Sequence, residues 1–266
     1  MSSERPLAGT WGLVLGASSG FGAATARACA RAGMSIIGVH LDRKATLPLA
    51  ESVARDVEAA GGVAHFFNVN AADDAKRAQV CQRAAEVVEA RPLRLFLHSL
   101  AFGTLRSFVA ETAAEQLTKA QLEMTLDVMA HSLVYWTQDL VQHGLVGAGT
   151  RVFAMTSAGG ARVLPAYGAV SAAKAALESH VRQLALELGR GGVAVNAIRA
   201  GVTDTPASRK IPGAEVIFAE ARRRNPGGRL TEPADVAQAI VALCQGPSTW
   251  MSGNVIGVDG GEDVVG

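Results

Sequence analysis

The fold of this chain is decided by the stretch Leu13-Val14-Leu15-Gly16-Ala17-Ser18-Ser19-Gly20-Phe21-Gly22. An apolar run of strand character ends at Leu15, and an alanine-rich helical pattern begins at Phe21. Glycines between a strand and a helix allow a tight turn. They also let backbone N–H groups approach a pyrophosphate, to which the helix N-terminus adds partial positive charge. The stretch therefore predicts a phosphate-binding turn made of Gly16, Ser18, Ser19, Gly20, Phe21 and Gly22.

Short apolar runs alternate with longer helical patterns along the rest of the chain. We expect strands at residues 12–15, 35–39, 63–69, 93–98, 150–155, 193–198 and 254–258. We expect helices at 21–32, 47–60, 74–89, 120–143, 165–189, 214–224 and 233–244. Such alternation implies right-handed crossovers and a parallel sheet covered on both faces. Because no repeat or linker interrupts it, we predict one α/β domain over residues 1–266, a doubly wound parallel sheet of Rossmann type.

The composition indicates a well-packed core and little net charge. Hydrophobic residues make up 49% of the chain, and 25 Lys plus Arg nearly balance 24 Asp plus Glu. This balance gives no field directed toward nucleic acid or a membrane. The three cysteines lie far apart and the histidines lack ligand spacing, so neither a disulfide framework nor a metal site is expected. Without a signal-peptide pattern or a membrane-length apolar run, we expect a cytoplasmic protein.

Several motifs together resemble the short-chain dehydrogenase/reductase superfamily along nearly the whole chain. They are the spacing Gly-x3-Gly-x-Gly of the turn, the pair Asn68-Val69 after the third strand, and the closing segment 251–261. The resemblance implies that NAD(P) is bound by the turn, by Asn68 and Val69, and by Ser99, Ala101, Gly201, Val202 and Thr203. It also implies a mobile substrate-binding segment at about residues 201–228.

The choice between NAD and NADP depends on the end of the second strand. An acid there binds the ribose 2′-hydroxyl, whereas a basic residue neutralises a 2′-phosphate. His40 occupies the position where the family usually has Asp, and Asp42 and the pair Arg43-Lys44 argue in opposite directions. We favour NADP(H) over NAD(H), with His40 and Arg43 in the cofactor site, because two cations follow a strand end that lacks the usual acid.

The candidate catalytic pair has an unusual spacing. Most of the superfamily uses Tyr-x3-Lys, but Val170 stands four residues before Lys174, and Tyr167 stands seven before it. Residues seven apart lie within about 20° of one helix face, so the two side chains can still act together. A nearby lysine lowers the pKa of a tyrosine from about 10. Ser157 occupies the usual catalytic serine position and is expected to donate an auxiliary hydrogen bond.

Tyr-x6-Lys is the pattern of enoyl-acyl-carrier-protein reductases within this superfamily. His98-Ser99 and Ala200-Gly201 also resemble that group, and the combination with this glycine spacing resembles its third bacterial type. The resemblance implies NAD(P)H-dependent reduction of a trans-2-enoyl thioester in fatty acid biosynthesis, with Tyr167 and Lys174 catalytic and with Lys174 also binding the cofactor. It also implies a homotetramer. An acyl carrier protein could dock on basic residues at 209–210 and 222–224, although a solvated charged face is an equal interpretation.

Two other functions stay open. One is a carbonyl or alcohol oxidoreductase that keeps Tyr167 in an unusual position. The other is a nucleotide-binding protein without catalysis, supported by the missing tyrosine at position 170 and by the absence of Asn from the long helix at 120–143. Ile211, Val216, Ile217 and Phe218 could line an acyl channel or pack against the core.

Overall fold

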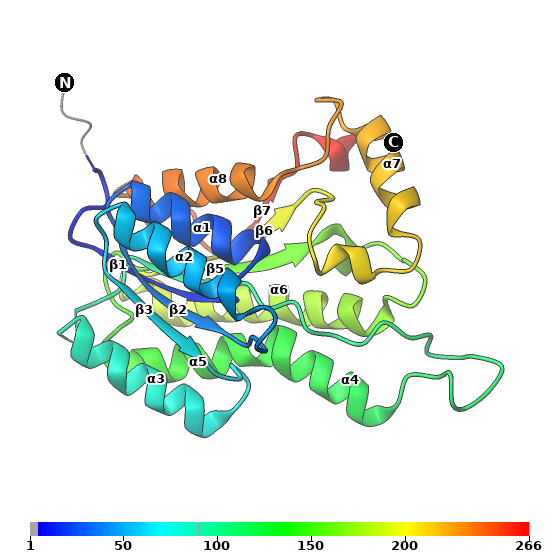
Figure 1. Cartoon of the computed structure of the whole chain (residues 1–266), viewed down its shortest axis with the longest axis horizontal. Helices are drawn as coiled ribbons and strands as arrows, with labels where there is room; N and C mark the ends of the chain where they lie inside the picture. The colour runs from blue at the N-terminus through cyan, green and yellow to red at the C-terminus, as the bar shows by residue number, and fades with distance from the viewer. Residues whose placement is uncertain (1–4, 90, 266) are drawn as a thin grey trace.

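The structure, a computed structural model, describes residues 5–89 and 91–265. At its centre is a parallel sheet of seven strands in the order β3-β2-β1-β4-β5-β6-β7 (Figure 1). All predicted strands are present, as β1 Trp11–Leu15, β2 Ser35–His40, β3 Ala64–Asn68, β4 Leu95–His98, β5 Arg151–Ser157, β6 Ala194–Ala200 and β7 Val255–Val258. The order reverses between β1 and β4. In such sheets ligands bind beyond the carboxyl ends of the strands at this point.

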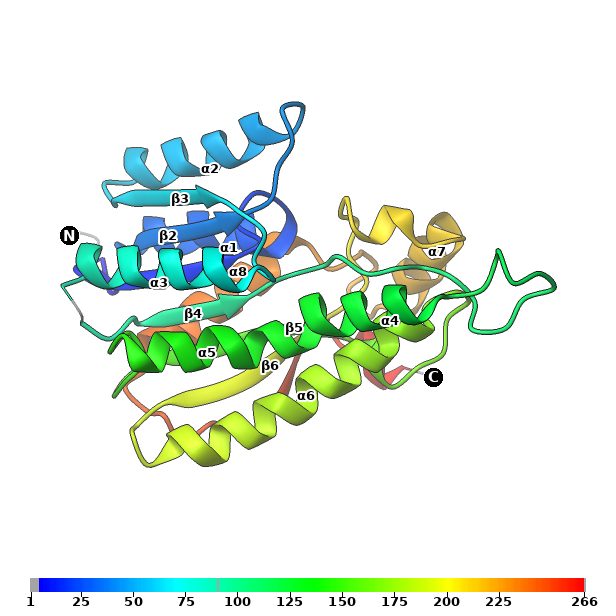
Figure 2. The ribbon, with the colours of Figure 1, turned by 90° about the horizontal axis from the view of Figure 1, so that it is seen from below.

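Helices cover both faces of the sheet (Figure 2). One face carries α1 Gly20–Arg31, α2 Leu47–Ala59 and α8 Pro233–Gln245, and the other carries α3 Asp74–Val87, α4 Lys119–Leu126, α5 Ser132–Gln142 and α6 Gly168–Gly189. Side chains alternate between the two layers along each strand. Leu13 and Leu15 of β1 pack beneath α5, whereas Val14 packs beneath α1. This confirms the doubly wound α/β fold.

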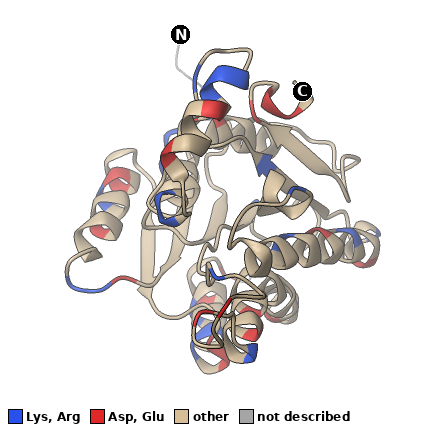
Figure 3. Ribbon diagram, turned by 90° about the vertical axis from the view of Figure 1, so that its right-hand side faces the viewer, with Lys and Arg blue, Asp and Glu red and all other residues tan. Residues whose placement is uncertain are grey.

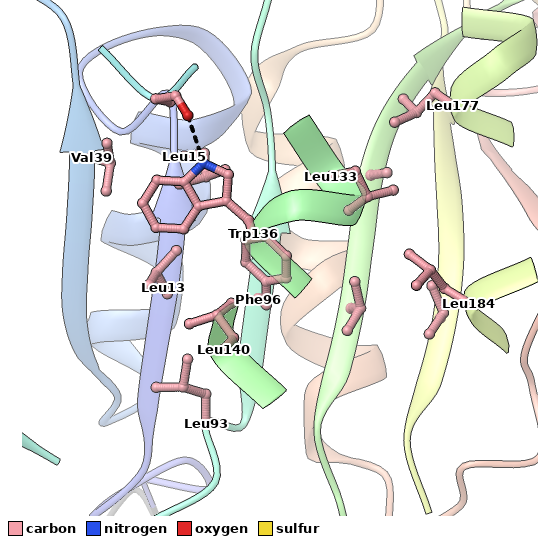
Figure 4. Close-up of a cluster of buried hydrophobic side chains, with 14 of the residues drawn as sticks. Leu13, Leu15, Val39, Leu93, Phe96, Leu133, Trp136, Leu140, Leu177 and Leu184 are labelled. Atoms are coloured by element: carbon pink, nitrogen blue, oxygen red, sulfur yellow. Dashed lines mark hydrogen bonds between the residues drawn. The ribbon is translucent and has the colours of Figure 1, made fainter. Parts of the chain in front are cut away.

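Trp136 is the largest side chain that is fully buried in the described chain, and it anchors the layer formed by α3, α5 and α6. Figure 4 shows it among Leu13, Phe96 and Leu140, with its indole N–H pointing to a backbone carbonyl. That acceptor is Ala71 O, at 2.8 Å from Nε1. A buried indole needs such a partner, because an unpaired N–H in the core is costly.

Two predicted helices differ in detail from the structure. The long helix at 120–143 is interrupted by a π-helical turn, Asp127–His131, which separates α4 from α5. The helix expected from residue 165 begins at Gly168, so Tyr167 is its N-cap and not part of its first turn. The reason is local, because Ala166 adopts a positive φ of 58°, which a helix cannot continue.

A smaller group of elements lies beyond the carboxyl edge of the sheet. It comprises α7 Ala214–Arg224, the short 3₁₀ helix Ser208–Lys210, and η4, a 3₁₀ turn at Glu262–Val264 that follows β7 (Figure 1). The connection between β4 and α4 projects from the same end of the molecule. Across residues 5–89 and 91–265, no helix is both long enough and apolar enough to cross a membrane.

Candidate active site

The turn between β1 and α1 has no room for side chains at two of its glycines. A Cβ at Gly16 would lie 2.2 Å from the carbonyl oxygen of Ser99, and one at Gly22 would lie 2.1 Å from Gly16 O. Gly16 and Gly20 have positive φ angles of 81° and 53°. Ser19 is the N-cap of α1 and makes no side-chain capping bond. The first N–H groups of α1 therefore face a tight, glycine-lined turn, which suits the pyrophosphate of a dinucleotide.

Ser18, Ser19 and Phe21 complete this turn as predicted from the sequence spacing. Ser18 and Phe21 are half-buried and Ser19 is exposed. The structure therefore brings all six predicted turn residues together at the point where the strand order reverses. No cluster of three or more His, Cys, Asp or Glu side chains that could hold a metal occurs in the described ranges.

At the end of β2, the side chain of Asp42 turns back toward the phosphate turn. Its carboxylate lies 2.8 Å from His40 Nδ1, and the two side chains are only 8% and 4% exposed. Burial alone would raise the pKa of Asp42, but hydrogen bonds from Thr46, Ser18 and His40 outweigh it and lower the pKa. A fixed carboxylate therefore stands beside Ser18, whereas Arg43 is exposed.

Asn68, at the end of β3, binds the backbone of Asp42 with both ends of its side-chain amide. Its Oδ1 accepts the N–H of Asp42 at 2.9 Å, and its Nδ2 donates to the carbonyl of Asp42 at 3.0 Å. Val69 follows directly and is half-buried. The sequence motif Asn68-Val69 is thus joined to Asp42, a residue that the sequence reasoning left outside the predicted cofactor site.

The other predicted cofactor residues follow β4 and β6. Ser99 lies against the phosphate turn, and Ala101 is exposed two residues further on. After β6, Thr203 is 5% exposed and its hydroxyl donates to Gly201 O at 2.9 Å. Val202 is half-buried between them. Both loops therefore lie near the phosphate turn beyond the carboxyl edge of the sheet, since Ser99 lies close to Gly16 and Thr205 lies near Gly20.

The candidate catalytic side chains come from β5 and α6. Ser157 ends β5, and its Oγ lies 3.5 Å from the hydroxyl oxygen of Tyr167. Lys174 is 6% exposed, and its Nζ donates to Met155 O at 2.7 Å. The ammonium has two further protons to donate. Lys174 therefore lies at the carboxyl end of β5, while the tyrosine and serine hydroxyls lie together at the start of α6.

Burial controls the protonation of this group. It raises the pKa of Tyr167, and the hydrogen bond with Ser157 offsets only part of the effect. Burial also lowers the pKa of Lys174 to about 8, against the opposing charge of Glu178. The sequence-based expectation that Lys174 lowers the pKa of Tyr167 is wrong in this structure, because desolvation dominates. At neutral pH the tyrosine keeps its proton and can donate a hydrogen bond.

A hydrogen-bond chain connects the end of β4 to the π turn. The Ser132 hydroxyl donates its proton to Val128 O at 2.8 Å. Nε2 of His98 lies 2.8 Å from the hydroxyl oxygen of Ser132, so Nε2 must carry the proton of that second hydrogen bond. Burial, reinforced by the charge of Lys174, lowers the pKa of His98 to about 3, so the imidazole is neutral. In the sequence, His98 stands out only as part of the motif His98-Ser99. Its partner Ser132 carried no sequence signal.

An aromatic side chain lies beside the start of α6. The Phe108 ring lies so close to Gly168 that a Cβ there would meet it at 2.5 Å. Of the residues considered for an acyl channel, Phe218 is only 6% exposed, whereas Val216 is 70% exposed. Phe218 therefore packs inside the group around α7, and Val216 is free to meet a ligand.

The basic residues near this end are largely paired with acids. Arg209 forms two hydrogen bonds to Asp204, at 2.6 and 2.7 Å, and Arg223 lies 3.0 Å from Glu220. Figure 3 shows the arginine-rich end of α7 close to the acidic η4 turn. Three of the five basic residues that were considered either as a docking surface or as a solvated charged face are thus paired with acids within the described chain: Arg209, Arg223 and Arg224.

The sequence of this chain is similar to those of known reductases and dehydrogenases. The family model described as Enoyl-(Acyl carrier protein) reductase matches residues 16–262. Enoyl-acyl-carrier-protein reductase (NADH) FabI of Aquifex aeolicus is 30% identical over 65% of this chain and 63% of its own length. Cis-4-hydroxycyclohexanecarboxylate dehydrogenase of Sinomonas cyclohexanicum is 31% identical over 95% and 96%. The chain thus spans less than two thirds of the FabI relative but nearly all of the dehydrogenase.

Solved structures share the fold over nearly the whole chain. A crystal structure of the Aquifex aeolicus VF5 enoyl reductase (NADH) superposes with a TM-score of 0.84 at 24% identity, covering 98% of this chain and 99% of that one. A short-chain dehydrogenase from Burkholderia cenocepacia J2315, in complex with NADP, superposes with a TM-score of 0.81 at 26% identity, covering 97% and 99%. These relatives therefore include one protein named for NADH and one whose structure is a complex with NADP.

Proposed function

Because the chain belongs to the enoyl-(acyl carrier protein) reductase family, within the short-chain dehydrogenase/reductase superfamily, we propose that it reduces the C=C bond of a trans-2-enoyl thioester. The observation that supports this most strongly is the geometry of Tyr167. It stands at the start of α6, seven residues before the buried Lys174, and its raised pKa keeps it a hydrogen-bond donor.

The proposed role of Tyr167 is to stabilise negative charge on the substrate. When bound, NAD(P)H supplies the hydride that adds to the β-carbon, and the thioester oxygen becomes enolate-like. The Tyr167 hydroxyl donates a hydrogen bond to that oxygen, with Ser157 as an auxiliary partner. One preorganised donor of this kind contributes about 3–4 kcal/mol to catalysis. The α-carbon then takes a proton from solvent.

Lys174 has a supporting role in this proposal. Its Nζ is fixed by Met155 O, which leaves two protons for the ribose hydroxyls of the cofactor. Its positive charge lies in a buried environment, where an ammonium stabilises nearby negative charge more strongly than it does in water. Lys174 therefore orients the cofactor and adds electrostatic stabilisation.

The apolar side chains near Tyr167 support an acyl substrate. Phe108, which contacts the start of α6, is 56% exposed, and Val216 on α7 is 70% exposed. Lys210 and Arg222 are both exposed. We assign them to the docking of an acidic acyl carrier protein, because opposite charges attract across such an interface. Segment 201–228 would then bind the acyl group.

The geometry at the end of β2 supports NAD(H), in contrast to the preference for NADP(H) inferred from the sequence. The buried, ionised Asp42 beside Ser18 can accept a hydrogen bond from a ribose 2′-hydroxyl. The same carboxylate would repel a 2′-phosphate. Arg43 is exposed and would have to reorient to neutralise that phosphate. We therefore propose NADH as the preferred reductant.

A carbonyl or alcohol oxidoreductase is the second candidate. The similarity to a hydroxycyclohexanecarboxylate dehydrogenase over 95% of the chain favours it. In that reaction the tyrosine hydroxyl gives its proton to the reacting oxygen, whereas in enoyl reduction it need only donate a hydrogen bond. The hydroxyl of Tyr167, with its raised pKa, therefore suits enoyl reduction better than carbonyl reduction.

We also propose a homotetramer, as the family resemblance implies. β7 is an edge strand of the sheet, and Trp250 and Met251, shortly before it, are 96% and 52% exposed. Exposed apolar side chains beside a free strand edge favour association with another copy. The mass measured by light scattering in solution tests this assembly.

The proposal is tested by oxidation of NADH and NADPH, each mixed with crotonyl-CoA. We expect turnover by the wild-type protein and a loss of about 100- to 1,000-fold in Tyr167→Phe, because one transition-state donor is removed. Tyr135→Phe is the matched control, since Tyr135 and Tyr167 are the only tyrosines. Turnover of ketones but not enoyl thioesters would support the second candidate. Tight cofactor binding without any turnover would support a non-catalytic nucleotide-binding protein.

A further inference from the structure

The η4 turn carries two consecutive acids whose partners lie on both segments that flank the candidate active site. We infer that Glu262 and Asp263 are positioning residues, which hold segment 201–228 and segment 158–167 in place around Tyr167. The inference does not depend on which substrate the site takes, although its kinetic consequence rests on the proposed function.

Glu262 connects the two ends of segment 201–228. It is 5% exposed, and each of its carboxylate oxygens has a different partner. Oε2 accepts the backbone N–H of Val202 at 3.0 Å, and Oε1 accepts Nη2 of Arg224 at 3.0 Å. Val202 opens the segment and Arg224 ends α7. A single buried carboxylate thus binds both the beginning of the segment, at Val202, and the end of α7, at Arg224.

Asp263 holds the other flank. Its carboxylate lies 2.6 Å from Nη2 of Arg162 and 2.9 Å from Nη2 of Arg199. Arg199 belongs to β6 and is part of the sheet, whereas Arg162 lies in the connection between Ser157 and Tyr167. Asp263 therefore ties the loop that carries the candidate tyrosine to the rigid sheet.

The middle of segment 201–228 packs largely on itself. Phe218 of α7 is buried, and among the described helices and strands the main partner of α7 is the 3₁₀ helix Ser208–Lys210 of the same segment. Arg209 and Val216 are largely exposed, at 65% and 70%, and the ion pair of Arg209 with Asp204 stays within the segment. A segment that packs largely within itself and is fixed at its two ends can open without disturbing the sheet, since local opening depends on local contacts. Glu262 sets how readily this opening occurs.

Glu262→Gln tests the inference with little change in shape. The amide has one oxygen and one NH2 group, so whichever way it turns, a donor faces either Val202 N–H or the Arg224 guanidinium. Losing one charge-assisted hydrogen bond should raise amide hydrogen exchange in residues 203–224 about tenfold. Exchange in the strands should stay unchanged. Asp263→Asn should raise exchange in residues 158–167 instead.

Glu220→Gln is the matched control, because Glu220 lies on α7 and pairs with the exposed Arg223. It should leave exchange in both segments unchanged. The inference is overturned if Glu262→Gln folds and leaves exchange in 203–224 as in the wild type. It is also overturned if exchange rises equally across the sheet, since Glu262 would then stabilise the whole fold and not this segment.

Steady-state kinetics give the second readout, which rests on the proposed function. With crotonyl-CoA, Glu262→Gln should raise KM several-fold more than it lowers kcat, because Tyr167 and Lys174 are untouched while the binding segment opens more readily. A fall in kcat at constant KM would contradict a positioning role. If the wild type does not reduce enoyl thioesters, the proposed function fails, and the exchange experiment still decides this inference.

Discussion

Lys174 is a residue whose buried environment brings its pKa close to neutral pH. Burial lowers its pKa to about 8, so the ammonium is present below pH 8 and is lost as the pH rises above it. We expect kcat/KM for enoyl reduction to fall through about pH 8. Tyr167 titrates well above this range, because burial raises its pKa. A pH–rate profile from 6 to 10 measures the effect.

Lys174→Arg separates this titration from any other. A guanidinium stays protonated across the whole range, so the variant should be slower but should show no fall near pH 8. A variant that keeps the same fall would assign the pH dependence to another group. A wild-type profile that stays flat up to pH 10 would contradict the predicted titration of Lys174.

Asp42 is the residue on which the cofactor choice depends. Removing its charge in Asp42→Asn should reduce the preference for NADH over NADPH by about tenfold, because the repulsion of a 2′-phosphate disappears and the bond to the 2′-hydroxyl weakens. Quenching or enhancement of reduced-cofactor fluorescence gives both dissociation constants without any substrate.

The control for this measurement is Asp56→Asn, which removes one charge from α2, where Asp56 pairs with Arg27 at 2.6 Å. Its cofactor ratio should match the wild type. A wild-type protein that binds NADPH more tightly than NADH would show that Arg43 and Lys44 decide the choice, as the sequence first suggested.

At the scale of elements, the π turn between α4 and α5 depends on one hydroxyl. Ser132 accepts from His98 Nε2 and donates to Val128 O, both at 2.8 Å. Ser132→Ala should lower the free energy of unfolding by about 2 kcal/mol, because it leaves the buried Nε2–H of His98 without a partner and removes the hydrogen bond to the half-buried carbonyl of Val128. Urea denaturation followed by circular dichroism measures the loss.

Ser179→Ala, at an exposed position of α6, serves as the comparison and should change stability by less than about 0.5 kcal/mol. If Ser132→Ala were equally neutral, the chain from His98 to the π turn would have no energetic importance. The neutral His98 would then be a packing residue only.

At the scale of the whole molecule, global stability depends on the layer around Trp136. Trp136→Phe removes the hydrogen bond to Ala71 O and leaves a small cavity, so we expect a loss of about 2–3 kcal/mol in the free energy of unfolding. Leu49→Ala is the control, because Leu49 is a half-exposed apolar residue of α2, far in the sheet order from the edge strand β7. Equal midpoints of denaturation for the two variants would contradict this assignment.

Local sequence was sufficient for much of the architecture. The strands are nearly continuous apolar runs, and the glycines at 16, 20 and 22 can form only a few kinds of turn, so neighbouring residues decided both. The spacing of Tyr167 and Lys174 likewise reflects one helix. The start of that helix was misplaced, because the positive φ of Ala166 has no signature in an alanine.

By itself, then, the sequence determined the doubly wound sheet and the glycine turn between β1 and α1, and it placed Tyr167 and Lys174 along the same stretch of helix. Only the tertiary structure decided the contacts that join distant segments. His98 and Ser132 are 34 residues apart, and Val202 and Glu262 are 60 apart. Such pairs form because the sheet order brings the ends of β4, β6 and β7 to one edge. The direction of a pKa shift also depends on burial, which is a property of the folded chain.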